Sequence, residues 1–239
     1  MNYQADKIIN TELLVAGGSG AAVTAAIYAA RQGTKVLLVS KGKAGFSGNV
    51  IMAGGGFGID GESGKQELNV DYADTHFTKQ MLYDCIVKES FYLADQAVVH
   101  QFVDDAPVVL KDYLAWAQRA GAKFLPIQPC GWQSSGAHFA KALGQGLKET
   151  PEVSVLEDTT LVELLKSDGA VVGAIALDIY SGEIIQINAK CVILGTGGYQ
   201  LFSLKNTTSD MSGDGQAMAY RAGATLSDME FMLAFPTAL

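Results

Sequence analysis

Cysteine is scarce in this chain, and its scarcity excludes several kinds of site. The 239 residues include only three cysteines, Cys85, Cys130 and Cys191, which lie far apart. Disulfide frameworks need paired cysteines, and zinc or iron–sulfur sites need close spacings such as CxxC. We therefore expect three reduced cysteines in a cytoplasmic protein and no metal site.

Positive charge and long apolar runs are lacking as well. Lysine and arginine total 17 against 25 for aspartate and glutamate, and no basic cluster occurs, which argues against nucleic acid as a partner. No apolar run approaches the roughly 20 residues of a membrane helix, and residues 1–10 are too polar for a secretory signal. With 49% hydrophobic residues, we expect a folded chain without membrane insertion.

Glycine, in contrast, is abundant, and its first cluster separates a predicted strand from a predicted helix. Residues 13–16 are apolar, residues 23–31 are alanine-rich, and residues 35–39 form a second apolar strand after Gly33. The turn of this βαβ unit consists of Gly17, Gly18, Ser19, Gly20 and Ala21. Backbone N–H groups at the start of such a helix face a pyrophosphate, so we expect a dinucleotide here.

The turn departs from the GxGxxG fingerprint in two ways. Ser19 stands at the second glycine position and Ala22 at the third, although a serine hydroxyl can donate to a phosphate. The acidic residue that normally binds a ribose is also missing, because the second strand ends in Ser40 and Lys41. The missing acidic residue disfavours a plain NAD dehydrogenase. A purely structural glycine turn stays open as an alternative.

The middle of the chain predicts a long loop followed by helices. Residues 42–64 are glycine-rich and are predicted to lack regular structure, either lying against a flat ring system or forming a flexible surface loop. An irregular segment is predicted over residues 123–138. Helices are predicted over residues 69–88, 90–103, 107–121 and 138–149. Nine of their side chains are assigned to the core: Tyr72, Phe77, Met81, Phe91, Tyr92, Leu110, Tyr113, Leu114 and Trp116.

No catalytic acid or base stands out in the sequence. His76 and His100 are lone helical histidines, and His138 follows an irregular segment without a recognisable partner. We expect His76 and His100 to be structural or on the surface. We expect His138 to be structural, with a position facing the cofactor as the alternative. Glu230 is a candidate site residue without an assigned role, and the catalytic residues are unknown.

The second half of the chain is rich in predicted strands, over residues 153–156, 161–166, 170–180, 183–188 and 191–194. Tight turns at 168–169 and 181–182 indicate an antiparallel ribbon. The last strand is apolar throughout, which is typical of a parallel sheet covered on both faces. A second glycine turn follows it, so we expect Thr196 and Gly197 to contact the ligand.

Asp214 precedes a predicted helix over residues 216–222, either as a ligand contact or as the helix N-cap. The order of elements predicts an α/β fold, with a Rossmann-like parallel central sheet and an antiparallel β-ribbon.

Together these motifs resemble the flavoprotein subunits of the succinate dehydrogenase and fumarate reductase family, which also includes aspartate oxidases and adenylylsulfate reductase alpha subunits. The motifs follow the family's order and spacing: GGSGAA at 17–22, SK at 40–41, SGN at 47–49 before AGGG at 53–56, GTGG at 195–198, SGDG at 212–215 and EFxxxxPT at 230–237. The resemblance covers the whole chain and implies an FAD-binding domain over residues 1–239.

The resemblance also implies roles for particular residues. The first turn would hold the FAD pyrophosphate, Ser40 and Lys41 would lie near the adenosine ribose, and Asp214 would contact FAD. Four residues would lie along the flavin: Ser47, Asn49, Gly54 and Gly55. Gly48 stands where members of membrane complexes carry the histidine joined to FAD, so we expect FAD to be bound non-covalently.

The sequence departs from this family at the end of the chain. Phe235 stands where members that act on fumarate or succinate carry a histidine, and Leu233 replaces a glutamine. Phenylalanine cannot donate a hydrogen bond, so we expect a less carboxylate-dependent substrate. Relatives continue into a capping domain that closes over the substrate. We therefore expect the N-terminal part of a longer flavoprotein, or a subunit completed by another chain, which is not a competent enzyme alone.

Three functions are compatible with these residues. The first is an FAD-dependent oxidoreductase that passes hydride or electrons between a small-molecule substrate and a redox partner. The second is an electron-relay subunit that serves an iron–sulfur partner and has no small substrate of its own. The third, an NAD(P)-dependent Rossmann enzyme, is disfavoured by Ser40 and by the second glycine turn.

Overall fold

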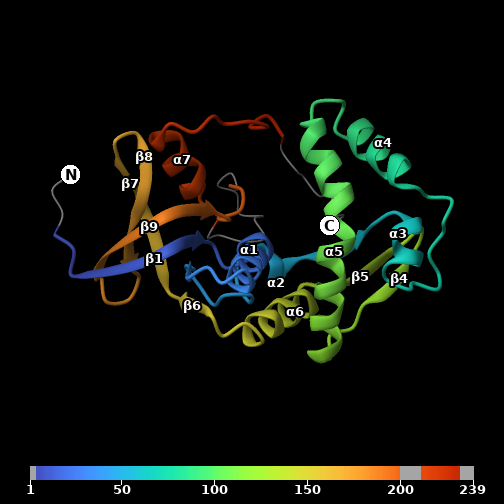
Figure 1. Cartoon of the computed structure of the whole chain (residues 1–239), viewed down its shortest axis with the longest axis horizontal. Helices are drawn as coiled ribbons and strands as arrows, with labels where there is room; N and C mark the ends of the chain where they lie inside the picture. Colours follow the sequence, from blue (N-terminus) through green and yellow to red (C-terminus); the bar gives the residue numbers. More distant parts are fainter. Residues whose placement is uncertain (1–3, 200–210, 232–239) are drawn as a thin grey trace, which may run out of the picture.

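A six-stranded sheet lies toward the left of Figure 1 in the computed structural model, which describes residues 4–199 and 211–231. From edge to edge its strands are β6 (Val153–Leu156), β2 (Val36–Val39), β1 (Lys7–Ala16), β9 (Ile184–Leu194), β8 (Ala170–Asp178) and β7 (Thr159–Ser167). β1 pairs in parallel with β2 and β9, and β2 pairs in parallel with β6. β8 pairs antiparallel with β7 and β9. The predicted α/β fold, with a parallel sheet and an antiparallel ribbon, is confirmed.

The last four residues of β1 and the whole of β2 are buried on both faces of this sheet. Three helices contribute to the core on one face: α1 (Gly20–Arg31), α5 (Gln96–Arg119) and α6 (Gly136–Lys148). Val15 of β1 faces these helices, whereas its neighbour Leu14 belongs to the core on the other face, together with Met218 of α7 (Asp214–Ala222). Since alternate residues of a strand point to opposite faces, the continuous apolar run of β1 supplies both cores.

A smaller antiparallel sheet lies beside the helices and contains β3 (Gly54–Gly58), β5 (Gly131–Ser135) and β4 (Leu125–Ile127). Two short helices flank β3 in the sequence, α2 (Asn49–Met52) and α3 (Gly61–Gln66). The prediction that residues 42–64 and 123–138 lack regular structure is therefore wrong. A run of glycines has little strand propensity of its own, and β3 forms because the distant β5 supplies its hydrogen-bonding partners.

The helices between the two sheets also differ from the prediction. The predicted helix over 69–88 is reduced to α4 (Lys79–Glu89), and those over 90–103 and 107–121 form the single helix α5. Pro107 lies inside α5 and is buried. A proline removes only one helical donor, and the buried side chains on either side of it, Val103 and Trp116, hold the helix against the core. Within the described residues, no helix combines the length and apolar character needed to cross a bilayer.

The assignment of core aromatics is confirmed in part. Trp116 is fully buried, but Phe91 and Tyr92 are 79% and 69% exposed, and Met81 is also exposed. The assignment of these three side chains to the core is wrong. Phe91 and Tyr92 lie between α4 and α5 with positive φ angles, so no helical face directs them inward.

The final strand is longer than predicted, because the segments 183–188 and 191–194 are continuous in β9. Ile193 is 37% exposed and Cys191 is exposed as well. The expectation that this end of the strand is covered on both faces is thus wrong for the described part of the chain. Cys191 and Ile193 pair with Leu13 and Val15 and lie on the face of α1, whereas Val192 and Leu194 pack against the core on the face of α7.

The N-terminus of α5 allows a test of the local fold. The Asp95 carboxylate accepts hydrogen bonds from the N–H groups of Ala97 and Val98, at 2.9 and 3.4 Å, and so caps the helix. Replacing Asp95 with alanine is expected to lower the free energy of unfolding by about 1 kcal/mol. Asp95→Asn, which keeps an acceptor, is the matched control. Urea denaturation of the two variants gives the comparison, and equal loss in both would contradict the capping role.

Candidate functional site

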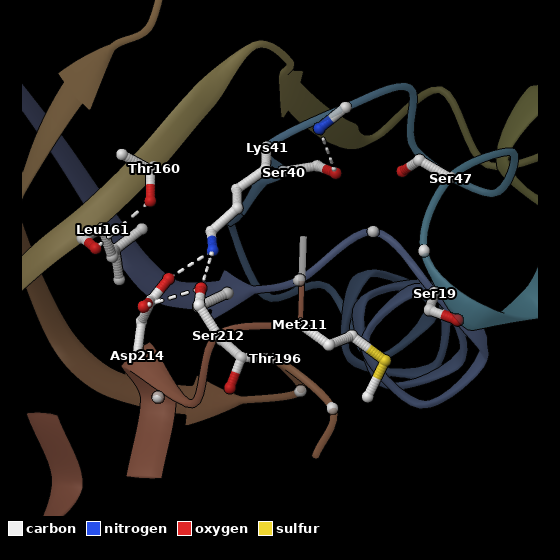
Figure 2. A pocket seen from close by; sticks show the side chains of 18 of the residues that line it. Ser19, Ser40, Lys41, Ser47, Thr160, Leu161, Thr196, Met211, Ser212 and Asp214 are labelled. Atoms are coloured by element: carbon white, nitrogen blue, oxygen red, sulfur yellow. Dashed lines mark hydrogen bonds and ion pairs between the residues drawn. The ribbon is translucent and has the colours of Figure 1, made fainter. Parts of the chain in front are cut away.

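A pocket opens where β1, β2 and β9 end, between the two glycine turns (Figure 2). Most of the predicted site residues line it: Gly17, Gly18, Ser19, Ser40, Lys41, Ser47, Gly48, Asn49, Thr196, Gly197 and Asp214. Gly20 and Ala21 lie in the first turn of α1, and Gly54 and Gly55 lie in β3. The fold therefore brings together motifs from both halves of the chain at the strand ends where open α/β sheets bind ligands.

The two glycine turns are in direct contact, and this contact excludes side chains. Gly17 has a φ of +124°, and a Cβ there would lie 2.2 Å from the carbonyl oxygen of Gly195. A Cβ at Gly195 would lie 2.7 Å from the Cβ of Ala22. Only glycine satisfies both the backbone angle and the available space at Gly17. The close approach of the turns leaves main chain, and not side chains, at the floor of the pocket.

The first turn of α1 fits an anionic group. Ser19 is the N-cap residue, yet its side chain makes no capping hydrogen bond within the described residues, and the first turn carries no acidic residue. The N–H groups of a helix's first turn have no acceptor inside the helix, and the helix dipole is positive at this end. With Gly17, Gly18 and Ser19 lining the pocket, this terminus is suited to a phosphate or pyrophosphate.

Ser40 packs against the first glycine turn, which leaves no room for a longer acidic side chain at the end of β2. Ser40 is only 3% exposed, and a Cβ at Gly18 would lie 2.1 Å from its hydroxyl oxygen. This oxygen accepts the N–H of Gly42 at 3.4 Å. A longer acidic side chain would have to displace the first glycine turn. Serine at this position therefore allows the end of β2 to pack against the first glycine turn.

Lys41 and Asp214 form an ion pair at the edge of the pocket (Figure 2). Lys41 follows β2, whereas Asp214 is the first residue of α7. Ser212 joins the pair: its hydroxyl accepts from Lys41 Nζ at 3.1 Å and donates to Asp214 Oδ1 at 2.9 Å. The N-cap of α7 is Gly213, so the alternative that Asp214 is the N-cap is wrong. The carboxylate instead holds α7 against the end of β2.

The ion pair makes a pH dependence testable. Burial raises the pKa of Asp214, but hydrogen bonds from Lys41 and Ser212 and the Lys41 charge outweigh it, so the folded-state pKa lies below the ordinary value of 3.8. A depressed carboxyl pKa stabilises the fold above the ordinary value, and this contribution disappears as the pH falls through the folded-state pKa. We expect Asp214→Asn to lower Tm slightly at pH 7 and to match the wild type at the acid end of a pH series. A constant difference in Tm would contradict this.

The SGN motif lies where the segment after β2 enters α2, whose first residue is Asn49. Gly48 has a φ of +72° and is the N-cap residue of α2. A residue with a Cβ adopts this conformation only with strain, which disfavours a histidine at this position. Ser47 and Asn49 line the pocket on either side of Gly48.

Gly54 and Gly55 lie beyond the pocket, on the edge strand of the smaller sheet. Among the described residues, nothing lies within 4 Å of a Cβ built at either position. The pocket itself measures about 180 Å³, below the roughly 300–1,000 Å³ of sites that enclose a small ligand. A dinucleotide must therefore extend out of it, and the role of Gly54 and Gly55 beside the flavin stays a prediction.

Sequence reasoning missed part of the pocket wall. Thr159, Thr160 and Leu161, at the start of β7, also line it, as does Met211. The N–H of Thr159 donates to the carbonyl oxygen of Ser40 at 3.0 Å, which ties β7 to the end of β2. The predicted strand over 161–166 indicated β7, but only the pairing of distant strands shows which of its ends meets the site.

A second cavity, of about 590 Å³, lies between α5, α6 and β3. Its wall is mostly apolar and includes Phe57, Phe102 and Phe139. Its one ionisable carboxylate is that of Asp105, and no lysine or arginine lines it among the described residues. An acidic rim disfavours phosphate, so the pocket at the strand ends is the better candidate for a ligand that carries phosphate.

The remaining candidate residues stand away from the pocket. His76 pairs with Asp74 at 3.1 Å and is almost fully exposed, and His138 accepts the N–H of Lys123 at 3.2 Å. Glu230 is exposed and does not line the pocket in the described chain. In the described ranges, no three His, Cys, Asp or Glu side chains group as a metal site. Phe235 and Leu233 lie outside the described residues.

Comparison with known families identifies the domain. Residues 12–239 match the family described as FAD binding domain. The chain belongs to this family. Because the match spans both glycine turns and the Asp214 motif, it fits a domain whose strand-end pocket holds a dinucleotide.

Similar curated proteins are flavoproteins. An FAD-dependent oxidoreductase of Methanocaldococcus jannaschii is 31% identical over 245 residues, which covers 97% of this chain and 43% of that protein. The fumarate reductase flavoprotein subunit of Haemophilus influenzae is 28% identical over 247 residues, covering 97% of this chain and 39% of that protein. The chain thus spans well under half the length of these two relatives.

Solved structures share the fold. The Sdh1 complex of Mycobacterium smegmatis matches with a TM-score of 0.75 at 22% identity, covering 91% of this chain and 39% of that chain. Adenylylsulfate reductase of Archaeoglobus fulgidus matches with a TM-score of 0.72 at 19% identity, covering 92% and 39%. The resemblance to the succinate dehydrogenase and fumarate reductase flavoproteins, first inferred from six short motifs, is confirmed.

Proposed function

We propose that this chain is the FAD-binding part of an oxidoreductase similar to fumarate reductase and succinate dehydrogenase flavoproteins. Hydride or electrons would pass between a small-molecule substrate and a redox partner. The observation that carries the proposal is the contact of the two glycine turns at the ends of β1 and β9, which leaves bare main chain beside the N-terminus of α1. This cradle has the chemistry of a dinucleotide site.

Different residues of the pocket would bind different parts of the cofactor. Gly17, Gly18 and Ser19 would hold the pyrophosphate through backbone N–H groups, and Lys41 would lie near its adenosine half. Gly48 supplies no side chain for a covalent link, so FAD would be held non-covalently. FAD, when bound, supplies the transfer of hydride or electrons. The chain's own residues bind and orient it, and the catalytic acid and base stay unassigned.

Residues 1–239 would act as one FAD-binding domain. The substrate site of the whole protein would need further residues or a partner chain, because the similar curated proteins are more than twice as long as the matched part. The three cysteines of the described chain are all free, which fits a reducing compartment, and we propose the cytoplasm.

A second function is favoured by one position in the sequence. Phe235 stands in the EFxxxxPT motif where a histidine would bind a substrate carboxylate, and phenylalanine can neither donate a hydrogen bond nor carry charge. The alternative is an electron-relay subunit that passes electrons from FAD to an iron–sulfur partner and binds no small substrate.

Anaerobic reduction of the full-length protein, purified with any chain that accompanies it, separates the two functions. Bleaching of the flavin absorption by a small substrate such as succinate or a thiol supports the first function. Bleaching that requires the co-purified partner supports the second. A colourless protein that binds NADH would contradict both.

A further inference from the structure

Glu157 lies just after β6, outside the residues that line the pocket in the described chain. Its Oε1 accepts the backbone N–H of Ala44 at 2.9 Å. We propose that Glu157 is a positioning residue for the FAD site, which it serves by fixing the segment between β2 and α2. The inference rests on the proposed function of the pocket.

The segment is attached to the site by two successive N–H groups. The N–H of Ala44 reaches Glu157, and the N–H of Gly45 donates to the carbonyl oxygen of Gly18 at 2.7 Å. Gly18 belongs to the first glycine turn, so the segment touches the predicted pyrophosphate site directly. The same segment then carries Ser47 into the pocket wall. The hydrogen bond to Ala44 therefore restrains the part of the segment that contacts Gly18 and carries Ser47.

The two partners of this hydrogen bond differ in burial. Ala44 is 5% exposed, whereas Glu157 is an exposed residue. Without the carboxylate, the Ala44 N–H would be left without its acceptor in a buried position, which is unfavourable. The segment would relieve this by moving Ala44 toward water, and Ser47 would move with it. The effect reaches FAD through the position of the segment and not through contact.

A charge effect is the competing explanation. Glu157 shares a surface groove with Lys43 and Lys148, so its carboxylate also lowers the positive charge beside the segment. The two explanations predict different effects of the Glu157→Gln substitution on FAD binding. Glutamine keeps an oxygen acceptor of the same length and loses the charge, whereas methionine has a similar size and loses both.

The test compares Glu157→Gln, Glu157→Met and the control Glu152→Ala, an exposed glutamate at the start of the β6 segment. Each is made in the full-length holoprotein, and FAD dissociation is followed by the rise in flavin fluorescence. We expect dissociation about tenfold faster in Glu157→Met and close to wild type in the other two. Amide hydrogen exchange over residues 42–48 should quicken in Glu157→Met alone, with Tm unchanged.

Several outcomes would overturn the inference. Equal dissociation rates in Glu157→Met and wild type would do so, as would Glu157→Gln behaving like Glu157→Met, which would assign the effect to charge. Unfolding of Glu157→Met would also contradict it, because the proposal limits the effect to one segment. A wild-type protein that holds no FAD would instead refute the proposed function of the pocket.

Discussion

Replacing Gly17 with alanine is expected to weaken FAD binding by about 100-fold or more, which corresponds to roughly 3 kcal/mol. A non-glycine residue in the conformation of Gly17, with φ at +124°, carries strain of about 1–3 kcal/mol. The added Cβ would also lie 2.2 Å from the carbonyl oxygen of Gly195, a backbone atom that cannot rotate away. The two glycine turns would have to separate, and the cradle for the pyrophosphate would be lost.

Gly20→Ala is the matched control for this substitution. Gly20 lies three residues further on, and a Cβ there meets nothing within 4 Å in the described structure. Alanine also favours the first turn of α1. Titration of FAD into both cofactor-stripped variants, followed by quenching of flavin fluorescence, gives the two affinities. Similar losses in Gly17→Ala and Gly20→Ala would show that the contact of the turns does not shape the site.

Lys41→Glu is expected to weaken FAD binding by about 10- to 100-fold. The change removes a cation from the pocket edge and places a carboxylate beside Asp214 and the phosphates of the dinucleotide. Both side chains of the ion pair are more than a third exposed, so water and salt screen part of the effect. The loss should therefore shrink as the salt concentration rises.

The control is Lys111→Glu, which changes the net charge equally at an exposed position on α5. Affinities measured at low and high salt separate a local effect from a general one. If Lys111→Glu weakens FAD binding as much as Lys41→Glu does, the loss reflects the net charge of the protein, and Lys41 has no special place in the site.

Local patterns in the sequence were enough to predict the βαβ unit. The strand of Leu14, the helix after Gly20 and the turn between them depend on neighbouring residues, and the structure has all three. The second glycine turn was also predictable from the sequence, because it follows an apolar strand. Since parallel strands end at one edge of a sheet, the convergence of the two turns followed from these assignments.

Long-range pairing could not be predicted in the same way. β3 is a run of glycines whose sequence favours a loop, and its pairing with β5 decides its structure. Pro107 suggested the start of a helix, but the packing of α5 carries the helix through it. The partners of Lys41 and Ala44, which are Asp214 and Glu157, are more than 100 residues away in the sequence. No periodicity or propensity indicates such pairs.

The central claim is that two glycine turns in contact hold one FAD without a covalent bond. Acid precipitation of the full-length protein, with flavin absorption measured before and after, tests it most directly. The account predicts a yellow protein whose flavin is released into the supernatant as intact FAD. A protein that stays colourless when FAD is supplied, or flavin that remains with the precipitate, would contradict the account.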